Sequence, residues 1–87
     1  MVIYRNNPTG RKYTLIAEGK STKINSGGKS ITVNHPLDMI SQAWFNWQMS
    51  GQFIQVAFDF LNPDEREFLI TGITPEEWKK LFPDGDK

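Results

Sequence analysis

The feature that most constrains the fold is a change in hydrophobic periodicity at Pro36. Before it, β-branched and aromatic residues alternate with polar ones between turn signals rich in Gly, Pro and Asn. This pattern predicts short strands at residues 2–5, 12–17, 20–24 and 30–33. After Pro36, apolar residues recur every three to four positions, which predicts helices. We therefore expect an α+β protein, with an N-terminal antiparallel β-meander of three to four short strands followed by three to four short helices.

The first helix is predicted over residues 36–47, with an apolar stripe that includes Trp44 and Trp47 and makes both tryptophans core residues. Residues 54–61 predict a second helix that is apolar nearly all round, and hence a central buried element. Capping signals predict two more helices. One begins after Asn62 and ends at Gly72, and the other begins after Thr74. In the last helix, three apolar residues are expected to face inward: Trp78, Leu81 and Phe82.

The 87 residues predict one domain, because so short a chain can hold only one hydrophobic core. We divide it into a β-meander (1–35), a helical part (36–83) and a frayed tail (84–87). No apolar run is long enough to span a bilayer, and the first residues lack the layout of a secretory signal. Cysteine is absent, so no disulfide can form, which fits a reducing compartment. We expect no membrane contact and a cytoplasmic location, in the host cell if the protein is phage-encoded.

The zero formal net charge conceals an asymmetry along the chain. Residues 1–35 hold six Lys or Arg against Glu18 alone, which gives +5, and residues 36–87 hold nine acids against four bases, which gives −5. A basic β-meander suggests a face that meets phosphate or an acidic protein. Strands that carry Lys outside, and helices that begin with Asp and Glu, would produce the same asymmetry without any binding role.

No pattern of catalytic or metal-binding residues is present, so we predict no enzyme activity, no metal and no cofactor. The segment 27–30 (Gly-Gly-Lys-Ser) ends like a phosphate-binding loop, but Lys23 stands where such a loop needs glycine, and a strand is predicted to follow. His35 is the only histidine. The acids of residues 64–77 crowd two helix starts, where capping and the helix dipole explain them.

The candidate binding residues are of three kinds. They are the Lys and Arg residues of the meander, a tyrosine beside them (Tyr4 or Tyr13) that can stack on nucleobases, and two apolar residues outside the apolar stripe of the first helix. The set is Arg5, Arg11, Lys12, Tyr13, Lys20, Lys23, Lys29, Phe45 and Met49. We expect a protein partner, bound by the basic face or an edge strand, because the acidic half of the chain would repel phosphate. The alternative is a nucleic-acid-binding protein that uses the basic face of the meander. The oligomeric state is left open.

The segment 61–78 resembles one found in small uncharacterised proteins of bacteriophages and related mobile elements. The similarity covers the C-terminal half of the chain, and its motif consists of two helix caps and the Gly72 stop. It therefore transfers no catalytic residue. What the resemblance implies is an accessory protein that binds and modulates a host or phage protein, or binds nucleic acid.

Overall fold

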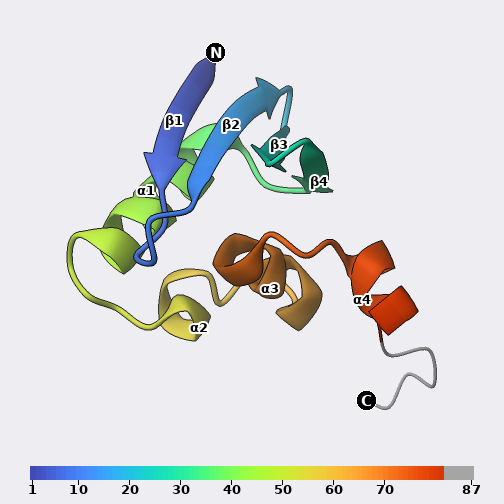
Figure 1. The fold of residues 1–87 in the computed structure, drawn as a ribbon. Coiled ribbons are helices and arrows are strands. Elements are labelled where there is room, and N and C mark those ends of the chain that lie inside the picture. The colour runs from blue at the N-terminus through green and yellow to red at the C-terminus, as the bar shows by residue number, and fades with distance from the viewer. Residues whose placement is uncertain (82–87) are drawn as a thin grey trace.

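The computed structural model describes residues 1–81, so Phe82 and the expected tail lie outside the described residues. Four strands form one antiparallel sheet in the order β1-β2-β3-β4, which confirms the predicted meander (Figure 1). The strands are β1 (Val2–Asn6), β2 (Lys12–Glu18), β3 (Ser21–Ser26) and β4 (Lys29–Val33).

A two-residue turn at Gly27 and Gly28 joins β3 to β4, and the flanking residues Ser26 and Lys29 face each other in the register. Both glycines have positive φ (58° and 80°), as a tight hairpin turn of matching twist requires. The Gly-Gly-Lys-Ser segment therefore forms a hairpin, and the strand β4 follows it as predicted.

Four helices follow the sheet in the described part of the chain, and the α+β class is confirmed. They are α1 (Leu37–Gln48), α2 (Ile54–Ala57), α3 (Pro63–Thr71) and α4 (Pro75–Leu81). Helix α1 packs on one face of the sheet, and α2 to α4 lie together at one end of the strands (Figure 1). None of these helices is both long and apolar enough to cross a membrane.

One core lies between the sheet and the helices. The inward side chains of the central strands, Leu15 and Ile24, are fully buried, as is Trp44 on α1. Trp44 contacts Trp47 and Phe58 edge-on, with ring centroids 5.4 and 5.8 Å apart. The prediction that both tryptophans are core residues is thus confirmed.

The second helix predicted over residues 54–61 forms only at residues 54–57, and its predicted position as a central buried element is wrong. Helix α2 has only four residues, and the exposed Phe53 and Val56 show that it lies at the surface. The chain leaves the helical conformation at Phe58, whose φ and ψ are −116° and 45°. Phe58 packs edge-on against Trp44 and Trp47. A helix that is apolar on every side needs burial all round, which so small a protein does not provide.

The predicted starts of α3 and α4 are confirmed by their caps. Asn62 accepts a hydrogen bond from the Glu65 N–H and Thr74 accepts one from the Glu77 N–H, and each glutamate side chain accepts one from the main chain of its cap residue. Gly72 ends α3 with φ of 77°.

The inward orientation predicted for Leu81 is wrong, since this residue is 59% exposed. Trp78 is half-buried, and no residue of α4 is fully buried. The reason is the peripheral position of α4, which packs beside α3 and leaves its far side to solvent (Figure 1).

Candidate binding surface

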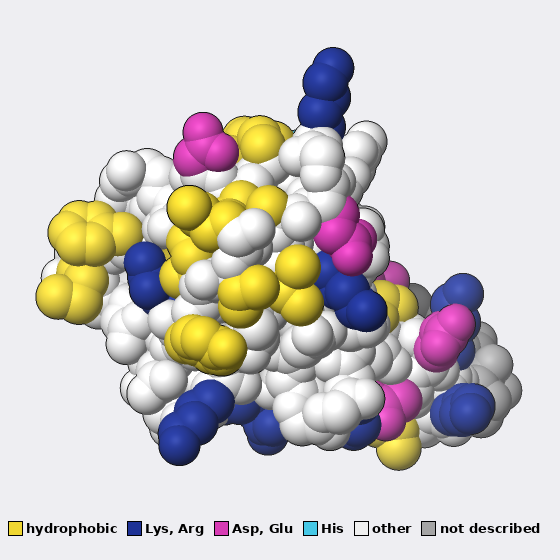
Figure 2. Space-filling view, turned by 90° about the horizontal axis from the view of Figure 1, so that it is seen from above, with side chains coloured by type: hydrophobic (Ala, Val, Ile, Leu, Met, Phe, Trp, Pro, Cys, Tyr) yellow, Lys and Arg dark blue, Asp and Glu magenta, His cyan; other side chains and the backbone are white. Residues whose placement is uncertain are grey.

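The basic residues of the meander do not form one patch. Lys12 and Lys23 point outward from the sheet, Lys20 lies in the turn between β2 and β3, and Arg5 lies on the helix side of β1. Lys and Arg side chains are scattered around a hydrophobic centre on the face shown in Figure 2. Strand alternation and turn position, which charge counting ignores, send these side chains in different directions.

Two of the bases contact the C-terminal helices. A Cβ at Gly72 would lie 2.9 Å from Arg11 Nη1, so the Arg11 side chain lies against the end of α3. A cation at that position is favourable because the C-terminal end of a helix is negative. Lys29 Nζ pairs with Glu77 Oε2 at 2.8 Å, the only ion pair within residues 1–81. Both bases therefore have structural partners.

Tyr13 is a core residue and is not available to stack on a ligand. It is 2% exposed, its hydroxyl donates a 2.7 Å hydrogen bond to the Phe68 carbonyl, and its ring packs edge-on against Trp44. Burial raises the pKa of Tyr13 to about 12. The accessible tyrosine is Tyr4, which is 75% exposed. Strand alternation carried this information, since Tyr13 shares its face with Leu15 whereas Tyr4 pairs with the outward Thr14.

The outer face of the sheet is one candidate surface, and we call it the open sheet face. It carries Tyr4, Lys12 and Lys23 together with polar residues such as Thr14 and Asn25 and the apolar Val2 and Ile16. A shallow hollow of about 380 Å³ lies beside Tyr4, Thr14 and Asn25 and extends to the β3–β4 turn at Gly27 and Gly28. Lys12 and Lys23 are not neighbours: Lys23 pairs with Ile16, four residues along β2 from Lys12 and so roughly 13 Å away.

A second candidate surface is a groove between β1 and α1, which we call the β1–α1 groove. Its volume is about 610 Å³, and its lining includes Met1, Ile3 and Arg5 on the strand side and Leu37, Asp38 and Phe45 on the helix side. Most of the exposed surface of this lining is apolar, and its polar groups belong to Arg5, Asp38, Ser41 and Gln42.

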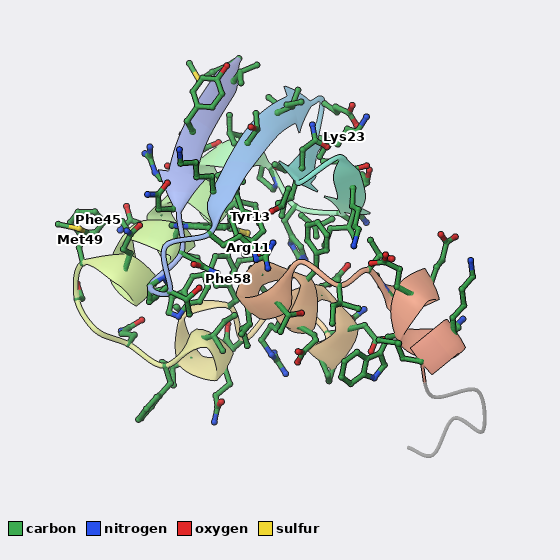
Figure 3. The ribbon with its side chains drawn as sticks, viewed as in Figure 1. Arg11, Tyr13, Lys23, Phe45, Met49 and Phe58 are labelled. Carbon is green, nitrogen blue, oxygen red and sulfur yellow. The ribbon has the colours of Figure 1, made fainter. Side chains whose placement is uncertain are left out.

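Phe45 and Met49 extend this groove along α1. They are 54% and 69% exposed and lie next to each other at one edge of the molecule (Figure 3). Hydrophobic side chains protrude at the same edge in Figure 2. The structure thus brings Arg5, Phe45 and Met49 of the predicted set together on one side. Charge and periodicity had not indicated Ile3 or Leu37 as groove residues. The helical stripe predicts Leu37 as a core residue, and its place in the groove depends on how α1 packs beside β1.

His35 and the acidic residues form no recognisable catalytic arrangement within residues 1–81. The His35 ring packs edge-on against Phe60, with centroids 4.7 Å apart, and its carbonyl accepts a hydrogen bond from Thr22. No three His, Asp or Glu side chains in this part of the chain gather as a metal site would require. Residues 27–30 form the β3–β4 hairpin, so they do not lead into a helix N-terminus as a phosphate-binding loop does.

Comparison of the chain with protein-family models, with curated proteins and with solved structures gives no match in any of the three. The site must therefore be interpreted from its own geometry and chemistry.

Proposed function

We propose that this is a non-enzymatic binding protein that binds another protein through the β1–α1 groove and the adjoining Phe45 and Met49, and thereby modulates that partner. The observation that carries the proposal is the exposure of these two large apolar side chains beside a mainly apolar hollow. Exposed apolar side chains gathered beside a hollow are typical of protein-interaction sites. Aromatic residues, Met and Arg are also enriched where proteins bind one another.

We also propose that the protein works in the cytoplasm, as its cysteine-free sequence suggests. Its expected role is that of a phage-type accessory protein, which the resemblance of residues 61–78 implies.

Affinity capture from the native cell tests this proposal. The full chain serves as bait, with nuclease added so that nucleic acid cannot bridge proteins. We expect a partner that binds wild type and loses at least tenfold in affinity, measured with purified proteins, when Phe45→Ser and Met49→Ser are combined. Met39→Ser is the control for loss of an exposed apolar side chain from α1, because Met39, unlike Phe45, does not line the groove. Equal binding by the double variant and wild type would contradict the proposal.

Nucleic-acid binding is the second candidate function, and the open sheet face is the observation that favours it. An exposed aromatic ring (Tyr4) beside lysines on an uncovered sheet is a geometry that stacks on bases and contacts phosphates. Fluorescence-anisotropy titrations with single- and double-stranded DNA and RNA test it. An affinity that falls steeply between about 50 mM and about 200 mM salt, and that Lys12→Gln with Lys23→Gln abolishes, would favour this function over protein binding.

A further inference from the structure

The outer edge of β1 carries unused main-chain hydrogen-bonding groups. The Ala17 N–H donates to the Met1 carbonyl at 3.0 Å, and the Asn7 N–H donates to the Arg11 carbonyl at 2.9 Å. In an antiparallel ladder, directly opposed residues alternate between pairs that exchange hydrogen bonds and pairs that do not. The main-chain N–H and C=O groups of the odd-numbered residues of β1 therefore point toward β2. Those of Val2, Tyr4 and Asn6 point the opposite way, out from the free edge of the sheet.

Part of this edge is already covered. The Asn6 carbonyl accepts a 2.9 Å hydrogen bond from Trp44 Nε1, so α1 closes that end. The Tyr4 carbonyl accepts a bond from the neighbouring Arg5 Nη1 at 3.0 Å, an exposed local contact that a ligand can replace. In the described part of the chain, the Tyr4 N–H and both main-chain groups of Val2 have no partner. Residues 2–4 thus present a short free strand edge.

The β1–α1 groove lies directly beside this edge. Ile3 and Arg5 project to the helix side of the sheet and form one wall of the groove, while Leu37 and Phe45 form part of the other. A strand added to β1 would direct every second side chain toward this groove and the others toward the open sheet face. The edge and the groove can therefore be occupied by a single extended segment.

The charge of the groove limits which segment fits. Within residues 1–81, Arg5 has no carboxylate at ion-pair distance, and its guanidinium bonds only to a neutral carbonyl. A carboxylate there would gain a charge-assisted contact. Asp38 in the same groove disfavours a strongly acidic segment. A second copy of this chain would place two Arg5 side chains on the same face of one short strand pair, where like charges are unfavourable.

From these observations we propose that the free edge of β1 accepts an extended segment of a partner protein as a fifth strand of the sheet. This segment has apolar side chains at alternate positions, which enter the β1–α1 groove, and one carboxylate that pairs with Arg5. The inference rests on the proposed protein-binding function. It specifies that the partner contributes an extended segment, with apolar side chains at every second position, and not a folded surface.

The test uses peptides selected from a library of random decapeptides against the full-length protein. Tyr4→Pro removes the outward N–H and leaves the bonds between β1 and β2, and proline is tolerated on an edge strand in such a position. Tyr4→Ala is the matched control, since it removes the same side chain but keeps the N–H. We expect selected peptides to lose at least tenfold in affinity for Tyr4→Pro and less than threefold for Tyr4→Ala. Arg5→Gln should weaken peptide binding and flatten its salt dependence.

A second measurement needs no protein variant and stands even if Tyr4→Pro fails to fold. Each amide of a selected peptide is N-methylated in turn and binding to the wild-type protein is measured. Strand addition predicts that affinity falls at every second position, because only alternate N–H groups face β1. Loss at no position, or at positions without a period of two, would overturn the inference, as would equal losses for Tyr4→Pro and Tyr4→Ala.

Two further outcomes also contradict it. If no peptide is enriched, strand addition is wrong. If the native partner no longer binds the Phe45 and Met49 double variant but binds Tyr4→Pro normally, strand addition is wrong while protein binding stands. If sedimentation shows a wild-type dimer that Tyr4→Pro dissociates and Tyr4→Ala does not, the edge is occupied by a second copy of the chain.

Discussion

At the scale of single residues, Asn7 connects the two parts of the fold. It is 1% exposed, and its Nδ2 donates to the carbonyls of Leu69 and Ile70 at 2.9 and 3.2 Å. These carbonyls belong to the last turn of α3, where intrahelical bonds are lacking. Its Oδ1 accepts hydrogen bonds from the main-chain N–H groups of Thr9 and Arg11. One side chain thus shapes the β1–β2 turn and holds it to a helix far away in the sequence.

We expect Asn7→Ala to lower the free energy of unfolding by about 3 kcal/mol, because it leaves buried carbonyls and turn N–H groups without partners. Urea denaturation measures the change. Asn6→Ala is the control, since the Asn6 side chain is exposed and makes no comparable bonds, and we expect it to change stability by less than about 0.5 kcal/mol. Similar values for the two variants would contradict the role assigned to Asn7.

Tyr13 makes stability sensitive to alkaline pH. Burial raises its pKa from 10.0 to about 12 in the folded protein. The contribution of the neutral phenol is therefore complete below pH 10 and is lost as the pH rises from 10 toward 12. Tyr13→Phe loses the hydrogen bond to Phe68 but cannot ionise, so we expect its stability deficit against wild type to shrink over this range. A constant deficit from pH 8 to pH 12 would argue against a buried phenol.

At the scale of elements, the helix caps determine where α3 and α4 begin. Asn62 and Glu65 satisfy each other's main-chain N–H groups at 2.8 and 3.0 Å. We expect Asn62→Ala to cost about 1 kcal/mol and Asn62→Gly only a few tenths of that, because glycine is also accepted at this position. Denaturant midpoints give both values. No loss for Asn62→Ala would mean that the cap does not stabilise the folded protein.

At the scale of the whole molecule, the opposite charges of the two halves meet in one ion pair within residues 1–81. The bond from Lys29 on β4, followed by that from the Thr74 N–H, lowers the pKa of Glu77 below its ordinary value of 4.5. Because the pKa is lower in the folded protein, the ionised Glu77 stabilises the fold at pH values above 4.5. This contribution to stability disappears as the pH falls through the lowered pKa. The charge asymmetry of the sequence is thus partly used to join the sheet to α4.

We therefore expect the stability difference between wild type and Glu77→Gln to be present at pH 7 and to vanish as the pH falls below about 4.5, through the lowered pKa. Salt at about 1 M should reduce it at pH 7 as well. Glu76→Gln is the control, because Glu76 is adjacent and exposed. If the stability difference between wild type and Glu77→Gln depends on neither pH nor salt, the ion pair contributes nothing to stability.

The sequence by itself determined the elements whose causes are local. The alternation of residues 2–33 and the two-glycine turn specify the meander. The capping side chains of Asn62 and Thr74 specify where helices begin, and the left-handed backbone of Gly72 specifies where α3 ends. These signals act over a few residues, so no tertiary information is needed to interpret them. The α+β class follows from them directly.

Only the tertiary structure decided the rest, because burial is shared between distant segments. Phe58 departs from the helical conformation and packs against Trp44 and Trp47, and the inward Tyr13 hydroxyl finds its hydrogen-bond acceptor in the Phe68 carbonyl, far away in the sequence. For the candidate site, the sequence predicted Phe45 and Met49 as apolar contact residues from their helical positions. The groove beside β1 and the direction of the free Tyr4 N–H depend on how α1 packs and on which residues pair across the sheet. Composition carries neither piece of information.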